Sequence, residues 1–375
     1  MFDRILLQHI KSTIDYKKAI ILIGARQVGK TTLINQLTES IDPKSILRID
    51  GDDPADRLLW TNPSKQTIQQ YINAYKVIII DEAQRIENIG LTVKIIIDLK
   101  EKKQVVLSGS SSIDITTKTS EALTGRKHEY NLFPFSWAEI SKEIGLPTCI
   151  KLLNKWLIYG AYPEVVTTDV AFETVIKNLA NSYLYKDILE YAGIRKPEII
   201  MKLLQALAWQ IGSEVSYNEL ALTVGVNKET IAKYIDLLEK SFVIFKLNPL
   251  TRNPRNEIST TRKIYFYDNG IRNAVIDNFK EIPLRNDIGQ LWENYFISER
   301  LKWLSYNELN AKQWFWRSKA QSEVDYIEEI NGDFNAFEIK WNEKAKFKFS
   351  KNFVEFYKPK IMQKVDRLNF WNFLK

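Results

Sequence analysis

The sequence predicts an α/β protein in which a first domain with a parallel sheet precedes a mainly helical region and a second α/β region. In the first third, short apolar segments alternate with helical segments, which is typical of a parallel sheet covered by helices on both faces. From about Ser136 to Tyr191 the apolar residues follow helical spacing, and strand-like segments return after about Arg262. We therefore expect domains over residues 1–135, 136–196, 197–267 and 268–375.

The individual elements follow from the same patterns. In the first domain the apolar segments predict strands at Ala19–Ile23, Ser45–Ile49, Lys76–Ile80 and Gln104–Leu107, with helices near residues 30–39 and 88–99. Towards the C-terminus, strands are expected at Lys263–Tyr267, Gln313–Trp316, Glu323–Ile327 and Asn335–Ile339.

Composition excludes several classes of protein. The 375 residues are 45% hydrophobic and 26% charged, which is ordinary for a globular chain. No run approaches the ~20 apolar residues of a membrane-spanning helix, and the N-terminus lacks the features of a secretory signal. The single cysteine, Cys149, excludes an internal disulfide, and two histidines are too few for a zinc site. We expect a cytoplasmic protein without membrane contact.

A glycine-rich loop follows the first predicted strand and precedes a predicted helix. It matches the pattern GxxxxGK[ST] without a mismatch, and its residues are Gly24, Ala25, Arg26, Gln27, Val28, Gly29, Lys30, Thr31 and Thr32. The glycines allow backbone N–H groups to surround phosphates, and the helix N-terminus adds its positive dipole end. Lys30 is expected to reach the β- and γ-phosphates, and the Thr31 hydroxyl to bind Mg²⁺.

A second motif completes this phosphate site. The apolar strand Val77–Ile80 is followed directly by Asp81 and Glu82, and a strand this apolar is expected to be buried on both faces. Its polar end then marks the sheet edge where ligands bind. We expect Asp81 to hold Mg²⁺ and Glu82 to polarise the attacking water as a general base.

Two further motifs leave alternatives open. The predicted strand that begins at Gln104 ends in small polar residues, of which either Ser108 or Ser110 is suited to sensing the γ-phosphate; a simple turn is the alternative. Arg126 precedes the segment His128–Phe135 and is a candidate for neutralising transition-state charge, in its own or a neighbouring subunit. A surface salt bridge explains Arg126 equally well.

These segments carry a family resemblance. GARQVGKTT, VIIIDEAQR, VVLSGSSS and LTGRKHEYNLFPFSWAEI occur in this order over roughly residues 1–145 and resemble a prokaryotic branch of the AAA+ ATPases, P-loop NTPases of the ASCE division. The resemblance implies an αβα sandwich with a sensor strand beside the Walker B strand, and ATP and Mg²⁺ as ligands. It also implies a ring or dimer in which Arg126 acts in trans.

The region Ser213–Leu250 has a helix-turn-helix pattern. Ser216 and Glu219 have the spacing of a capping box, and a short turn at 224–227 precedes a would-be recognition helix at 228–235. Two strands joined by a basic loop with Arg252, Arg255 and Arg262 would form a wing. Such units bind either DNA or proteins, and the balanced charges here do not decide between them.

The C-terminal region contains a candidate nuclease site. Asp325 near the start of one strand and Glu338-x-Lys340 on the next have the arrangement of PD-(D/E)XK nucleases, and Glu293 on an upstream helix would complete the cluster. Strand alternation places Glu338 and Lys340 on one face, where carboxylates can bind Mg²⁺ and the lysine can orient water. A β-hairpin with surface salt bridges is the alternative.

The C-terminal half also resembles the domain of unknown function that commonly follows these ATPases. The resemblance covers the chain from about Pro197 to the end, and it implies a helix-turn-helix region followed by a nuclease-like fold, without implying cleavage. Val324 stands where the nuclease pattern has proline, while the acidic residues are in place.

The last segment of the chain is strongly basic. Residues 340–375 contain ten Lys or Arg against three Asp or Glu, and aromatic residues are interleaved with them. Such a segment can follow a phosphate backbone and stack bases, or it can be an amphipathic segment whose aromatics pack inward.

The sequence thus favours an ATP-hydrolysing protein that couples its nucleotide state to nucleic-acid binding or processing. The alternative is a nucleotide-dependent switch whose C-terminal half binds a protein partner without cleavage.

Overall fold

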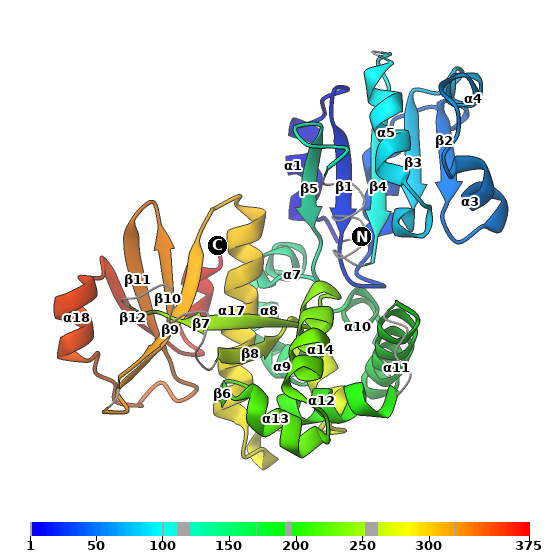
Figure 1. Cartoon of the computed structure of the whole chain (residues 1–375). Coiled ribbons are helices and arrows are strands. Elements are labelled where there is room, and N and C mark those ends of the chain that lie inside the picture. Colours follow the sequence, from blue (N-terminus) through cyan, green and yellow to red (C-terminus); the bar gives the residue numbers. More distant parts are fainter. Residues whose placement is uncertain are drawn as a thin grey trace. The chain divides into compact units, whose positions relative to one another are not determined.

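The computed structural model describes residues 2–99, 101–110, 121–169, 171–191, 197–251, 262–318 and 320–375 (Figure 1). The chain divides into two compact units, one formed by residues 1–133 with 240–242 and the other by residues 134–239 with 243–375. The finer division into four domains stays a prediction. Within the described residues, no helix is long and apolar enough to cross a membrane.

The first unit is built on a five-stranded parallel sheet with the order β2-β3-β4-β1-β5 (Figure 1). Its strands are β1 (Ala19–Ile23), β2 (Ile46–Asp50), β3 (Val77–Asp81), β4 (Gln104–Gly109) and β5 (Lys127–Asn131). The first four confirm the predicted strands to within two residues at each end. The fifth, β5, was missed because it is an edge strand of mostly polar residues, KHEYN, of which only Tyr130 is buried.

Helices connect β1 to β2, β2 to β3 and β3 to β4, as parallel pairing requires. They are α2 (Lys30–Thr38), α3 (Pro54–Trp60), α4 (Lys65–Ile72) and α5 (Ile89–Asp98), and α1 (Ile5–Ser12) precedes β1. The apolar residues of β1, β3 and β4 are buried, which accounts for their nearly continuous apolar sequences. The predicted α/β fold of this unit, a parallel sheet with P-loop topology, is confirmed.

The second unit contains a seven-stranded mixed sheet with the order β12-β11-β10-β9-β7-β8-β6. Its strands are β6 (Glu214–Val215), β7 (Ile244–Pro249), β8 (Arg262–Phe266), β9 (Lys312–Arg317), β10 (Glu323–Ile330), β11 (Asp333–Ile339) and β12 (Ile361–Val365). A short parallel pairing of β7 with β9 joins the β7–β8 pair to the C-terminal strands. Strands on both sides of residue 267, where we placed a domain boundary, therefore belong to one sheet.

The helices of the second unit lie mostly before this sheet in the sequence. They are α7 (Trp137–Ile144), α8 (Leu146–Lys151), α9 (Leu153–Tyr159), α10 (Pro163–Thr167), α11 (Phe172–Tyr191), α12 (Pro197–Trp209), α13 (Tyr217–Val224), α14 (Lys228–Lys240), α16 (Asn269–Val275), α17 (Ile288–Tyr306) and α18 (Lys351–Tyr357). The helical region predicted from Ser136 onward is thus present.

The two helices expected between residues 216 and 240 are also present. Ser216 caps α13 by accepting a hydrogen bond from the Glu219 N–H, and Gly225 ends this helix with a φ of +80°. The strands expected for the wing pair as antiparallel β7 and β8. Of the arginines of the wing loop, Arg252 and Arg255 lie outside the described residues, and DNA binding by this region stays a prediction.

Buried charges on α17 tie distant segments of the second unit together. Lys302 and Glu299 are 1% and 2% exposed and form an ion pair of 2.6 Å. Lys302 Nζ also donates to the Phe135 carbonyl at 3.2 Å, and Glu299 Oε2 accepts from the Trp137 N–H at 2.5 Å. Because a buried charge is costly unless it is paired and hydrogen-bonded, this arrangement fixes where α7 begins against α17.

We predict that Lys302→Met lowers the free energy of unfolding by about 3–5 kcal/mol, because it leaves the Glu299 carboxylate buried without its ion-pair partner. Urea denaturation followed by tryptophan fluorescence measures this change. Adding Glu299→Gln should restore most of the loss. The exposed pair Lys360–Asp333 provides the control, where Lys360→Ala should cost about 1 kcal/mol or less. A similar loss in both lysine variants would contradict the prediction.

Candidate active site

The parallel sheet of the first unit brings three sequence motifs to one edge. β4 pairs with both β1 and β3, so the carboxyl ends of all three strands lie at the same edge of the sheet. The glycine-rich loop follows β1, Asp81 ends β3, and Ser108 lies near the end of β4. The strand with the small polar residues therefore lies between the phosphate loop and the Walker B strand, as the family resemblance implied.

The phosphate loop has the backbone that its glycines allow. A Cβ atom on Gly24 would lie 2.2 Å from the Leu132 carbonyl oxygen, so only glycine fits there. Gly29 has a φ of +96° directly before α2, a conformation that L side chains rarely adopt. Lys30 is 7% exposed, and its Nζ donates to the carbonyls of Gly24 and Ala25 at 2.9 Å each. The ammonium thus lies against the loop itself.

Oxygen ligands suitable for Mg²⁺ converge beside this loop. Thr31 Oγ1 donates to Asp81 Oδ2 at 3.3 Å, so the two predicted metal ligands are adjacent. Asp81 Oδ1 accepts from the Ser108 hydroxyl, and from the Glu82 N–H at 3.0 Å. A hydroxyl and one carboxylate, completed by water and phosphate oxygens, are what Mg²⁺ takes in nucleotide sites, and the residues present fit it.

Glu82 is held by two neighbours. It has a φ of +43°, and its Oε2 accepts hydrogen bonds from Gln84 Nε2 and, at 3.3 Å, from Ser110 Oγ. Gln84 Nε2 also donates to Ser110 Oγ at 3.3 Å. Of the two serines proposed as γ-phosphate sensors, Ser108 thus contacts Asp81 and Ser110 contacts Glu82. Gln84 was not among the predicted site residues, although its place two residues after Glu82 is a usable signal.

Arg4 also supports this site, although no sequence motif indicates it. Arg4 is 5% exposed, and its guanidinium donates to the carbonyl of Val28 within the phosphate loop. Twenty-four residues separate the two. Only the folded chain shows that the segment before α1 supports the phosphate loop.

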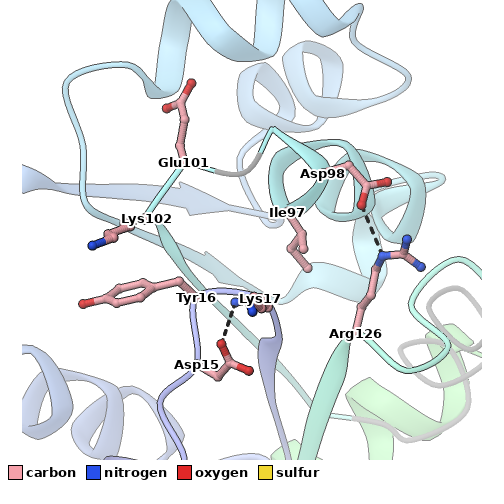
Figure 2. A pocket seen from close by; sticks show the side chains of 8 residues that line it. All are labelled: Asp15, Tyr16, Lys17, Ile97, Asp98, Glu101, Lys102 and Arg126. Atoms are coloured by element: carbon pink, nitrogen blue, oxygen red, sulfur yellow. Dashed lines mark hydrogen bonds and ion pairs between the residues drawn. The ribbon is translucent and has the colours of Figure 1, made fainter.

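Arg126 lies at the amino end of β1, whereas the phosphate loop lies at its carboxyl end. It precedes β5, and its carbonyl accepts from the Ala19 N–H at the start of β1, whereas the phosphate loop follows the end of β1. Figure 2 shows its side chain with Asp98, to which Nε donates at 3.2 Å, in a pocket of about 610 Å³ formed with the turn before β1 and the end of α5. Within one chain Arg126 does not face the phosphate loop, and a role in trans stays a prediction.

The C-terminal candidate residues do come together. Lys340, which directly follows β11, has its Nζ 2.9 Å from Asp325 Oδ2 and 3.0 Å from Glu338 Oε2, so Glu338 and Lys340 lie on the same side of the chain. The Ile339 N–H also donates to Asp325 Oδ2 at 2.7 Å. These contacts match the predicted order of acids and lysine on two neighbouring strands.

Two residues of β8 enter the same cluster and were missed. Glu293 Oε1, from α17, accepts from the Tyr265 hydroxyl at 2.6 Å and from Lys263 Nζ at 3.1 Å. Lys263 Nζ also pairs with Glu323 Oε1 at 2.5 Å. Alternation along β8 places Lys263 and Tyr265 on one face, but nothing in the sequence shows that this face meets α17 and β10.

The electrostatics of the cluster follow from burial and close opposite charges. Burial raises the pKa of Glu338 to about 7, with Asp325 adding to the rise and Lys340 opposing it. Burial also raises the pKa of Glu293, against the effect of Lys263. For the Lys263 ammonium, burial lowers the pKa, but Glu293, Glu323 and Asp325 outweigh it and the net shift is upward. The lysines therefore remain charged at neutral pH.

This cluster does not have the arrangement of a metal site. In the part of the chain that the structure describes, no group of three or more His, Cys, Asp or Glu side chains is placed to hold a metal ion. The carboxylates contact ammonium groups instead, and the sequence left open whether this site cleaves nucleic acid.

Comparison with known proteins agrees with the nucleotide site. The family model of the AAA domain matches residues 16–141. This part of the chain is thus similar to AAA domains. Together with the phosphate loop and the Asp81–Glu82 pair, the match supports ATP binding and hydrolysis at a P-loop site. Two domains of unknown function, DUF8612 and DUF4143, match residues 150–281 and 288–368.

Relatives extend over most of the chain. An uncharacterized protein of Mycobacterium tuberculosis is 26% identical over 86% of this chain and 70% of its own length. One from Haemophilus influenzae is 25% identical over 68% of each. Among solved structures, a Walker-type ATPase of Pyrococcus abyssi aligns at 16% identity and a TM-score of 0.48, covering 74% of this chain and 96% of its own. The Orc1 protein of Aeropyrum pernix, solved with DNA, aligns at 11% identity and a TM-score of 0.31, covering 72% and 91%.

We predict that Lys30→Ala abolishes ATP hydrolysis, that Glu82→Gln strongly reduces it, and that the two variants differ in ATP binding. Lys30→Ala removes the charge that contacts the phosphates, so ATP binding should be lost as well. Glu82→Gln removes only the proton acceptor, so ATP binding should persist while turnover falls by about 10²- to 10⁴-fold. Phosphate release and the binding of a fluorescent ATP analogue measure the two quantities, with circular dichroism as the check on folding. Unchanged turnover in folded Lys30→Ala would refute the assignment.

A second prediction concerns pH. The pKa of Glu338 is about 7 in the folded chain, against an ordinary value of 4.5. At a pH between these two values, the carboxyl therefore takes up a proton when the chain folds. Its contribution to stability is fully present below about pH 4.5 and is lost as the pH rises through about 7. Glu338→Gln should therefore flatten the pH dependence of the unfolding free energy in this window by up to about 3 kcal/mol. Urea titrations at several pH values test this, and an unchanged slope would contradict it.

Proposed function

We propose that the nucleotide state of the AAA domain controls the binding of nucleic acid by the C-terminal part of the chain. ATP hydrolysis supplies the two states, because the contacts around the γ-phosphate exist only before hydrolysis. The observation that carries the nucleic-acid part is a row of exposed lysines in the basic segment that follows β11.

This lysine row consists of Lys344, Lys346, Lys348 and Lys351. All four side chains are exposed, and Phe347, between two of them, is 43% exposed. Other aromatics of the same segment pack inward, with Phe353 and Phe370 fully buried. The segment is therefore anchored by some aromatics while it presents positive charge and one exposed ring, a combination that suits phosphates and a stacked base.

In the proposed hydrolysis, each group has one role. The backbone N–H groups of the loop and the Lys30 ammonium bind the phosphates, and Thr31 and Asp81 would hold Mg²⁺, which neutralises charge that develops on the phosphate oxygens. Glu82 takes the proton of the attacking water, and Gln84 and Ser110 orient its carboxylate. Arg126 would complete the site only from a second copy of the chain, which makes an oligomer part of the proposal.

The second candidate is a switch whose C-terminal half binds a protein. The surface of α13 and α14 favours this protein-binding switch. Their exposed residues include charges of both signs and the apolar Leu222, which is 84% exposed. The two candidates differ in the salt dependence of binding, since releasing counterions from phosphates makes nucleic-acid affinity fall steeply with salt.

We predict that single- or double-stranded DNA stimulates ATP hydrolysis, and that Lys344→Ala, Lys346→Ala and Lys348→Ala together weaken DNA binding. Loss of three phosphate contacts should reduce the slope of log affinity against log salt by about 2–3. Fluorescence anisotropy at several salt concentrations measures it. A matched triple variant of exposed lysines elsewhere, at Lys11, Lys151 and Lys202, should change little. Turnover indifferent to DNA, or binding insensitive to salt, would favour the protein-partner switch.

A further inference from the structure

Lys263 lies in the C-terminal carboxylate cluster, where its ammonium group contacts Glu293 and Glu323. We propose that Lys263 is a built-in counter-ion that takes the place of a divalent cation, so that the cluster is closed to metal and does not cleave nucleic acid. This inference is separate from the proposed function, which requires binding but no cleavage.

The contacts of Lys263 are those of a cation shared between carboxylates. Its Nζ lies 2.5 Å from Glu323 Oε1 and 3.1 Å from Glu293 Oε1, and so bridges β10 and α17. Asp325 adds to the negative potential at the same ammonium. A divalent cation that bound these carboxylates would have to displace the ammonium from both contacts.

The position of Lys263 in the fold makes such displacement costly. Its side chain is 3% exposed and lies in β8, a strand whose other residues from Ile264 to Phe266 are buried. A buried lysine needs close opposite charges, and here the acidic residues provide them. The ammonium is thus held inside the fold between two acidic partners.

The ion pairs divide four acids between two lysines. The carboxylates of Glu293, Glu323, Asp325 and Glu338 face two ammonium groups, those of Lys263 and Lys340. Lys340 contacts Asp325 and Glu338, and Lys263 contacts Glu293 and Glu323. The two ammonium groups balance two of the four carboxylate charges, and burial reduces the remainder, because it raises the pKa values of Glu293 and Glu338 and so favours their protonated forms. A magnesium site instead needs ionised carboxylates that accept the metal and its waters.

The backbone also covers one of the acids. A Cβ atom on Gly212 would lie 3.4 Å from Glu293 Oε1, so the loop before β6 packs against this carboxylate. Glu293 is accordingly 15% exposed. The acid that would complete a nuclease site is therefore covered by the chain and neutralised by Lys263.

The test is to count Mn²⁺ ions bound to the full, nucleotide-free chain by electron paramagnetic resonance. Any Mn²⁺ near Asp81 is common to all variants and cancels in the differences. Lys263→Met removes the counter-ion but keeps a side chain of similar length, and it should bind one more Mn²⁺ than the unmodified protein, with at least tenfold higher affinity. Adding Asp325→Asn should abolish that gain. Lys263→Arg keeps the positive charge and should gain nothing.

The unmodified protein gives an independent answer if Lys263→Met fails to fold. Asp325→Asn alone should then leave both the number of bound Mn²⁺ ions and the absence of Mg²⁺-dependent DNA nicking unchanged. A bound Mn²⁺ or a nicking activity that Asp325→Asn removes would overturn the proposal. A failure here is distinguishable from a failure of the proposed function, because salt-dependent DNA binding and ATP turnover are measured without reference to this cluster.

Discussion

The parallel pairing of β1, β4 and β3 is the constraint on which the nucleotide site depends. It brings the loop that contains Lys30 and the carboxylates of Asp81 and Glu82, some fifty residues apart in the sequence, to one sheet edge. The strand between them carries Ser108, whose hydroxyl contacts Asp81, and leads into Ser110, which contacts Glu82. Without this middle strand Asp81 and Glu82 would lack the hydrogen bonds from the two serine hydroxyls.

In the second unit, buried charges add to an apolar core in setting the positions of the elements. Near its start, α17 contributes Glu293 to the C-terminal cluster. Further along the same helix lies the Glu299–Lys302 ion pair. Each charge is paired, because an unpaired charge at such burial would cost several kcal/mol. The same helix thereby fixes the sheet and the first helices of the unit. A unit held in this way can keep a nuclease-like arrangement of acids for structural reasons alone.

The limits of sequence-based prediction are clear from particular elements. The strands of the first unit were predictable wherever burial on both faces made them wholly apolar, and β5 was missed because an edge strand lacks that signal. β12, with the pattern Ile361–Val365, was missed because only its last residue is buried. Three residues that contact the sites were not predicted. Gln84 contacts Glu82 and Lys263 contacts Glu293. Arg4, which belongs to no motif, donates to a carbonyl of the phosphate loop.

The sequence by itself determined the phosphate loop, the Walker B acids and the order of acids and lysine at the C-terminus. These motifs are local, and their residues lie within one loop or strand or on two strands that follow each other in the chain. The tertiary structure alone decided which edge of the sheet each residue faces, and hence that Arg126 lies away from the phosphate loop of its own chain. It also decided that the C-terminal carboxylates meet a buried ammonium, because the partners of a charge depend on strand pairing and helix packing between segments far apart in the chain.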